Sequence, residues 1–294
     1  FLSSEFGFDH KDAHRARNDA LNTGKLFMLL IQQISSMPFS VIEKINKIYK
    51  NKSLYNSLIY KNSLKMMKKE LNNNISSIKD FNIKNNILFS KRGNSNEFIK
   101  KNVNEWFSDN GILSKMWKGY SKRSEQIKLS DDIYSNFKNQ DILIAEAGAG
   151  LGKSLSYLIS GLIYSMQNNK TLVISTYTKT LQEQLFNKDI PMLINELNLD
   201  LKAVILKGKN NYISKINLEK IINNNHIYME DKDIFECVTL IVWSQFTKTG
   251  DIEECNGFDK QKINQLWAKV GYSDESSKLK FTQNDYYNRV IKES

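Results

Sequence analysis

The stretch Ala147-Gly148-Ala149-Gly150-Leu151-Gly152-Lys153-Ser154 decides the fold expected for this chain of 294 residues. It follows the apolar run 142–145 and opens a segment with helical periodicity. Small residues let the backbone wrap closely around a triphosphate, so that its N–H groups and the helix dipole face phosphate oxygens. We therefore predict a phosphate-binding loop in which Lys153 reaches the β and γ phosphates and Ser154 holds Mg²⁺. The alternative is a glycine-rich turn before a helix.

Short apolar segments alternate with helical ones around this loop. Strands are predicted at 142–145, 171–175 and 203–206, and helices at 124–137, from the loop to about 166 and from the second strand through 185. Such alternation is typical of an α/β domain with a parallel sheet. After Gly208 the alternation fades, and residues 211–294 are predicted to form a helical accessory lobe with Trp243 and Trp267 in its core.

The part of the chain before residue 97 has a different composition. Residues 1–36 end in an amphipathic helix over 18–34, and residues 37–96 are rich in Lys and Asn, which predicts a basic helical linker. Residues 37–103 contain fourteen Lys or Arg against four Asp or Glu, which accounts for the whole net charge of +10. This segment either binds nucleic-acid phosphates or is a solvated linker enriched in Lys by codon bias.

Composition also bounds the setting of the protein. No run approaches the ~18 apolar residues of a membrane span, and the N-terminus does not resemble a signal peptide. We expect no membrane partner and a cytoplasmic location, with Cys237 and Cys255 as buried thiols in a reducing compartment. The chain lacks an initiating Met, and we expect it to be a fragment.

Motifs on both sides of the loop carry a family resemblance. Arg123-Ser124-Glu125-Gln126 precedes the first predicted strand, and 175–185 (Ser-Thr-Tyr-Thr-Lys-Thr-Leu-Gln-Glu-Gln-Leu) follows the second. With the loop, in which Ala147 replaces the usual first Gly, these segments resemble superfamily 2 DNA helicases of the DinG and XPD type. The resemblance implies a P-loop, RecA-like fold in which Arg123 and Gln126 select the adenine of ATP, since a Gln amide pairs with N6 and N7. It also implies that Thr176, Thr178 and Gln182 contact the DNA backbone.

The segment 206–214 (Leu-Lys-Gly-Lys-Asn-Asn-Tyr-Ile-Ser) matches the same family. Members with an iron–sulfur cluster place its first cysteine where this chain has Ser214. A four-iron cluster usually needs four thiolates. With two cysteines in the chain, we expect no cluster and a cluster-free lobe at 211–294.

Near the N-terminus, His14-Arg15-Ala16-Arg17-Asn18-Asp19 resembles the last motif of DEDDh-type 3′–5′ exonucleases. That resemblance implies that His14 is a general base and Asp19 a Mg²⁺ ligand, with residues 1–36 the end of an exonuclease domain. A surface helix is the alternative. The remaining exonuclease carboxylates would precede Phe1, and the Asp-Glu-Ala-His box of the helicase would follow Ser294.

Together the resemblances imply a bacterial ATP-dependent DNA helicase with 5′–3′ polarity, acting on single-stranded and forked DNA in repair or replication and linked to an exonuclease. ATP and Mg²⁺ are the implied cofactors, and the sequence names no protein partner. Two alternatives stay open: a nuclease that an ATP-binding domain regulates without unwinding, and a non-catalytic nucleic-acid-binding module centred on the linker.

Overall fold

The computed structural model describes residues 16–50, 52, 54, 56–70, 87–89, 100, 102–197, 199–225, 229–259, 264–273 and 286–293. The chain divides into two compact units. The first comprises Phe1–Asn85 with Gly208–Lys292, and the second comprises Asn86–Lys207 with the last two residues. The phosphate-loop sequence therefore lies wholly in the second unit.

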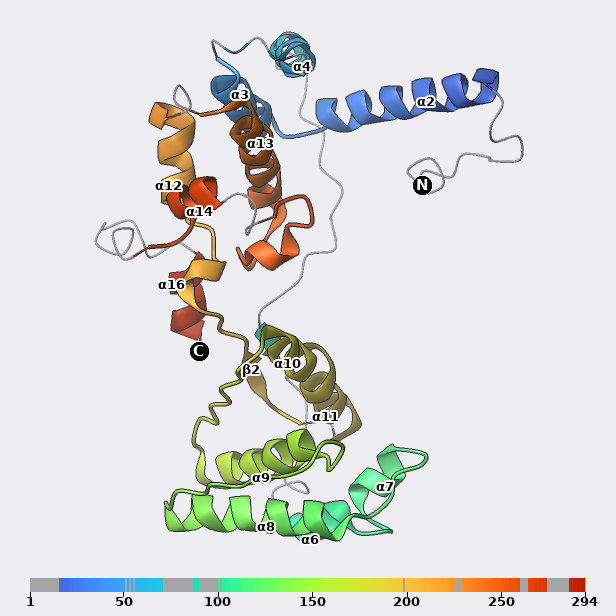
Figure 1. The fold of residues 1–294 in the computed structure, drawn as a ribbon, viewed down its shortest axis with the longest axis vertical. Helices are drawn as coiled ribbons and strands as arrows, with labels where there is room; N and C mark the ends of the chain where they lie inside the picture. Colours follow the sequence, from blue (N-terminus) through green and yellow to red (C-terminus); the bar gives the residue numbers. More distant parts are fainter. Residues whose placement is uncertain are drawn as a thin grey trace. The chain divides into compact units, whose positions relative to one another are not determined.

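Two parallel helices form the centre of the second unit. Helices α8 (Ser124–Asn139) and α9 (Lys153–Asn168) lie side by side (Figure 1). They run in the same direction, because Ser130 meets Ser160 near their middle and Tyr134 bonds Gln167 near their ends. The short helices α6 (Val103–Phe107) and α7 (Ile112–Met116) complete this side of the unit.

The core of the second unit collects apolar side chains from most of its elements. An Asn102 capping box starts α6, which places Trp106 and Phe107 in the core without exposed surface. Around them lie further buried residues of α7, of α9 and of the chain between residues 190 and 200, which are Leu113, Leu158, Ile159, Ile163, Leu193 and Leu199. Ile127 and Tyr134 of α8 are partly buried against this core, and burial of its apolar area favours the packing of the unit.

The first two predicted strands are not assigned as strands in this structure. Both segments lack a ladder partner among the described residues, and Ile142, Ile144 and Val173 are 90%, 94% and 82% exposed. Residues 171–176 nevertheless alternate between exposed and half-buried positions, which is the two-residue period of a strand. The parallel sheet therefore stays a prediction.

The third predicted strand, 203–206, overlaps β2 (Lys202–Val204) at residues 203–204, and β2 pairs antiparallel with β1 (Ile87–Phe89). Before β2, helix α10 (Lys179–Gln184) continues through a π-helical turn, Leu185–Asp189, into α11 (Ile190–Leu197). The π turn buries Leu185 and Phe186 while Asn187 stays exposed.

The first unit combines the predicted basic linker with the predicted accessory lobe. Its helices are α2 (Ala16–Ser35), α3 (Phe39–Ile48), α4 (Ser57–Glu70), α12 (Lys215–Lys220), α13 (Asp231–Phe246), α14 (Asn264–Val270) and α16 (Tyr286–Glu293). Helix α3 packs its buried face against α13, and Lys52 Nζ donates to Met229 O at 2.8 Å. The predicted domain boundaries are not tested by this packing, but it shows that linker helix α3 is part of a packed core.

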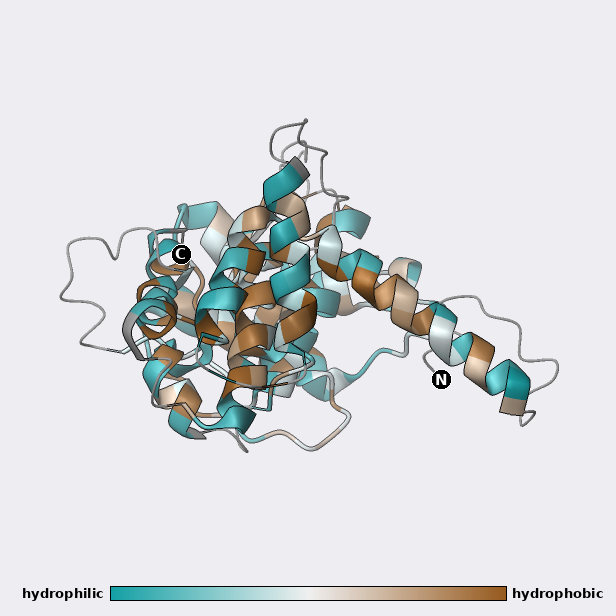
Figure 2. Ribbon diagram, turned by 90° about the horizontal axis from the view of Figure 1, so that it is seen from above, coloured by the Kyte–Doolittle hydropathy of each residue, from teal (hydrophilic) through white to brown (hydrophobic). Residues whose placement is uncertain are grey.

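Helix α2 buries no residue completely. Figure 2 shows apolar and polar segments alternating along it, and Leu21, Phe27 and Met28 are more than half exposed. Among the described residues no single helix is long and apolar enough to cross a membrane, although α2 and α3, bent by 105°, pass that test as a pair. Trp267 is 6% exposed, as predicted for a core residue, and Trp243 is half-buried.

Candidate nucleotide-binding site

The predicted phosphate loop forms an exposed turn that ends at the first residue of α9. Gly150 and Gly152 have φ of +81° and +88°, a left-handed region that residues with a Cβ rarely adopt. A side chain on Gly148 or Gly150 would meet no described atom within 4 Å beyond its chain neighbours. The two left-handed glycines turn the backbone sharply while the loop surface stays open.

Lys153 folds back over this loop. Its ammonium donates to Ala147 O at 2.6 Å and to Gly148 O at 3.0 Å. Ser154 follows in the first turn of α9 and is half-buried. Contact with an anion would exchange these two neutral carbonyl acceptors for charged oxygens, which form stronger hydrogen bonds.

Arg123 and Gln126 contact the loop from the start of α8. The Arg123 guanidinium donates to Gly150 O, and Gln126 Nε2 donates to Gly152 O at 3.0 Å. Arg123 is exposed, whereas Gln126 is 3% exposed. The structure therefore brings the two residues of the predicted adenine motif onto the carbonyls of the phosphate loop.

Three buried serines, absent from the predicted site, lie where α8 meets α9; Ser156 and Ser160 donate from α9 to α8, and Ser130 donates within α8. Ser130 Oγ donates to Gln126 O at 2.7 Å, Ser160 Oγ donates to Ser130 O at 2.8 Å, and Ser156 Oγ approaches Gln126 O at 3.4 Å. All three are fully buried. The sequence signal for them was a pair of small polar residues four apart, 156 and 160, facing 126 and 130 at the same spacing.

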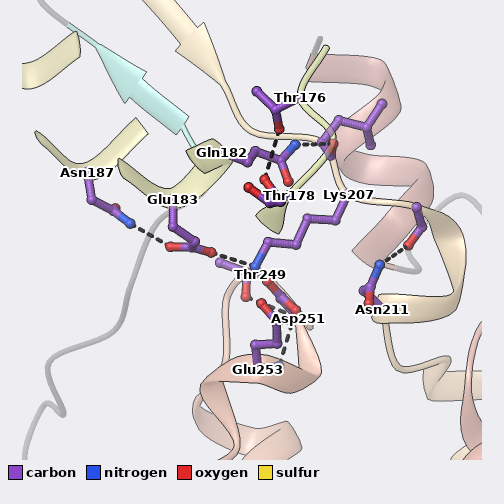
Figure 3. A network of polar contacts seen from close by, with 12 residues as sticks. Thr176, Thr178, Gln182, Glu183, Asn187, Lys207, Asn211, Thr249, Asp251 and Glu253 are labelled. Atoms are coloured by element: carbon purple, nitrogen blue, oxygen red, sulfur yellow. Dashed lines mark hydrogen bonds and ion pairs between the residues drawn. The ribbon is translucent and has the colours of Figure 1, made fainter. Parts of the chain in front are cut away.

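The polar turn after residue 175 is shaped by its own hydroxyls. Thr178 caps α10 by accepting from Leu181 N at 3.3 Å, and Thr176 Oγ1 donates to Thr178 O at 3.1 Å (Figure 3). Gln182 Nε2 donates to Leu206 O at 2.8 Å. These three residues, predicted to contact DNA, lie together at one turn, and Thr178 is exposed.

An ion pair between a buried lysine and a partly exposed glutamate lies beside this turn and was not predicted from the sequence. Lys207 has a side chain that is only 2% exposed, and its ammonium lies 2.5 Å from Glu183 Oε1. Asn187 Nδ2 donates to the other carboxylate oxygen of Glu183 at 2.6 Å (Figure 3). The pair and the Gln182 bond together fasten residues 206–207 to α10.

Burial and hydrogen bonding shift the pKa of two groups near the start of α8. Burial raises the pKa of Tyr120, whose hydroxyl donates to Phe107 O at 3.1 Å, while the charge of Arg123 opposes this shift. Hydrogen bonds from its own backbone N–H and from the Ser124 hydroxyl lower the pKa of Glu125. An ionised carboxylate in the first turn complements the dipole of α8.

The remaining predicted site residues lie in the first unit. His14 is outside the described residues, and Asp19 is an exposed residue of α2 whose carbonyl accepts from Thr23 Oγ1 at 2.8 Å. Ser214 is fully buried and caps α12 by accepting from Asn217 N at 3.3 Å. The metal role of Asp19 stays a prediction.

Both cysteines are buried free thiols, as predicted. Burial raises the pKa of Cys237 to about 12 and that of Cys255 to about 11. They are therefore protonated at neutral pH and behave as small apolar side chains.

Comparison with known proteins finds relatives over most of this chain. It is 26% identical over 289 residues, 94% of its length, to a protein of Bacillus subtilis (strain 168) named 3'-5' exonuclease DinG. It is 30% identical over 272 residues, 89% of its length, to the protein of the same name in Staphylococcus aureus (strain USA300). The predicted resemblance to DinG is confirmed. The chain spans only 29% and 28% of the length of these two DinG proteins, and no protein-family model matches it.

Proposed function

We propose that this chain carries the ATP-binding segment of a bacterial DinG-type DNA helicase that is linked to a 3′–5′ exonuclease. The observation that carries the proposal is the loop 147–152, which is exposed, turns on two left-handed glycines and ends at α9 with Lys153. The similarity to proteins named 3'-5' exonuclease DinG over about nine-tenths of the chain supports it. On this proposal the protein acts in the cytoplasm.

The residues of the loop fit a triphosphate. The start of the 16-residue helix α9 supplies backbone N–H groups and the positive end of a helix dipole. Lys153 would hold the β and γ phosphates and Ser154 the Mg²⁺ ion. ATP, when bound, would supply the free energy of its hydrolysis to the motor, and this chain's loop would bind and orient its phosphates.

We also propose that the segments before and after α9, residues 142–145 and 171–176, are strands of one sheet. Their apolar side chains and the two-residue burial period at 171–176 support their assignment to a RecA-like parallel sheet. In that arrangement the loop, Thr176 and Thr178 would share the carboxyl edge of the sheet, where ligands of α/β proteins bind.

DNA is the proposed partner of the turn at 176–182. Its hydroxyl and amide groups suit contacts with a sugar-phosphate backbone, which fix position and carry no sequence information. Tyr177 is fully exposed at this turn and offers a ring on which an unpaired base can stack. The exposed ring favours single-stranded DNA, whose unpaired bases can stack on it, over duplex DNA.

The name of the relatives favours a second candidate, an exonuclease whose activity ATP binding regulates without strand separation. Strand displacement by the full-length parent protein separates the two candidates. Unwinding that depends on ATP and is lost in Lys153→Ala supports the helicase. ATP-dependent exonuclease activity without strand displacement supports the regulated nuclease.

The first test is nucleotide binding by the 294-residue chain, measured by calorimetry with Mg-ATP. We expect Lys153→Ala to weaken binding by about 10- to 100-fold, the value of a hydrogen bond between charged groups. Lys138→Ala is the matched control, since Lys138 is an exposed lysine in the last turn of α8. Equal affinity in both variants, or no saturable binding by a folded wild-type chain, contradicts the proposal.

A further inference from the structure

The contact between Gln126 and Gly152 uses the space that a side chain on residue 152 would fill. Gln126 is 3% exposed and its amide donates to Gly152 O at 3.0 Å. A Cβ on residue 152 would lie 2.2 Å from Gln126 Nε2, closer than any real contact. The amide therefore lies directly beneath the backbone of the phosphate loop.

A side chain that bonds a peptide carbonyl also orients the N–H group of the same peptide, because the peptide bond is planar. The C=O and N–H of a trans peptide point in opposite directions. The carbonyl of Gly152 accepts from Gln126 Nε2 and also from Ser156 N at 3.2 Å, which is the first helical bond of α9, so the N–H of Lys153 points out of the start of that helix. Arg123 holds Gly150 O in the same way, which directs the N–H of Leu151. Gly150 has a positive φ and precedes the helix, so the bond from Arg123 fixes a peptide that α9 does not hold, whereas Gln126 adds a second donor to a carbonyl at the start of α9.

The buried serines hold Gln126 in place from behind. Its carbonyl accepts from Ser130 Oγ at 2.7 Å and lies 3.4 Å from Ser156 Oγ, and Ser160 fixes the carbonyl of Ser130. The bonds of Ser156 and Ser160 cross from α9 to α8 between fully buried side chains, whereas the bond of Ser130 lies within α8. A sliding of one helix along the other would break the two crossing bonds, so they fix the position of Gln126 relative to the loop.

We infer that Gln126, together with Arg123, is a positioning residue that orients the phosphate-loop N–H groups, and that its contribution to nucleotide binding is independent of the base. The inference rests on the proposed function of the loop as a triphosphate site. It differs from the adenine-selecting role implied by the family resemblance, because the Gln126 amide already donates to the loop backbone.

The test compares three ligands that share the phosphates and differ in the base: Mg-ATP, Mg-GTP and inorganic tripolyphosphate with Mg²⁺. Gln126→Met keeps the length of the side chain and removes the donor. We expect it to weaken all three ligands by about five- to tenfold, the effect of one neutral hydrogen bond. Gln245→Met, at an exposed position of α13, is the matched control and should change none of them. Weakening confined to ATP overturns the inference in favour of adenine selection.

A second readout needs no ligand. In nuclear magnetic resonance spectra of the 294-residue chain, Gln126→Met should shift the backbone amide signals of Leu151 and Lys153, while those of the buried part of α9 stay in place. Ser156→Ala should shift the same two signals, and Ser135→Ala, at an exposed position of α8, should not. Unchanged loop signals in Gln126→Met, or shifts spread over both helices, overturn the inference. Failure of wild type to bind any polyphosphate would contradict the proposed function and leave this readout to decide the orienting role.

Discussion

Replacing Gly250 by Ala gives a sharp test of the packing in the first unit. Gly250 has φ of +72°, and its carbonyl accepts from Ile213 N at 2.9 Å. A Cβ at this position would lie 2.3–2.5 Å from Cγ, Cδ2 and Cβ of Tyr286. Tyr286 is 2% exposed, and its hydroxyl donates to Ser244 O at 3.0 Å. The ring cannot move aside without losing that bond.

The expected loss follows from two separate costs. The left-handed conformation costs an alanine about 1–2 kcal/mol. Forcing a methyl group into a filled site costs about 1–3 kcal/mol more. The free energy of unfolding should therefore fall by about 2–5 kcal/mol, which is a large part of the ~5–15 kcal/mol of a typical domain.

Gly119→Ala is the control that separates these costs. Gly119 has φ of +95°, but no described atom lies within 4 Å of the added Cβ beyond its chain neighbours. It should lose only the conformational part, about 1–2 kcal/mol. Urea unfolding gives the totals, and hydrogen exchange of peptides within 229–259 locates the effect of Gly250→Ala. Equal losses in the two variants, or unchanged exchange in 229–259, would refute the packing around Tyr286.

Three further predictions concern a buried charge, the thiols and the extended segment 171–176. Lys207→Ala should lower the free energy of unfolding by about 1–2 kcal/mol. This loss is smaller than that for a fully buried ion pair, because Glu183 is 38% exposed. In urea unfolding, Lys207→Met should recover most of the lost stability. Cys237 and Cys255 should react with a thiol reagent at pH 8 only when the chain unfolds, and rapid labelling of the native chain would contradict this. Their pKa values are raised in the folded chain, so their contribution to stability is complete below the unfolded pKa near 9. That contribution should be lost as the pH rises toward about 11–12. Val173→Lys should leave the free energy of unfolding unchanged, because Val173 is 82% exposed. Leu172→Lys should lower it by about 1–2 kcal/mol, because Leu172 packs on the core. Equal effects of the two substitutions would contradict the alternation of exposed and half-buried residues at 171–176.

The helix starts around the loop could be predicted because their signals are local. Ser124 begins α8 as expected, and α9 begins at Lys153, immediately after the glycines. In both cases the determinant lies within a few residues of the helix end, where the polar N–H groups of the first turn need partners. The same holds for the turn at 176–178, where Thr178 caps α10.

Contacts between residues far apart in the chain could not be predicted from local sequence patterns. Nothing in the neighbourhood of Lys207 indicates that its ammonium is buried against Glu183, which lies 24 residues earlier. Likewise, the basic composition of 37–70 indicates an exposed, solvated segment. It does not indicate that the apolar face of α3 packs against α13. Charge and composition describe the exposed face of a helix, whereas its partner depends on residues elsewhere in the chain.

The extended segments show why a strand is harder to predict than a helix. A helix satisfies its backbone groups within its own residues, so α9 forms wherever its sequence favours it. A strand needs a neighbour for every second N–H and C=O, and its propensity reflects packing against that neighbour. Residues 171–176 have the side-chain alternation of a strand, with Leu172 and Ile174 toward the core, but no ladder among the described residues. The alternation is encoded locally by the apolar pattern, and the ladder depends on a second segment. A partner strand that pairs with the backbone of residues 171–176 is therefore the structural event on which the proposed parallel sheet depends.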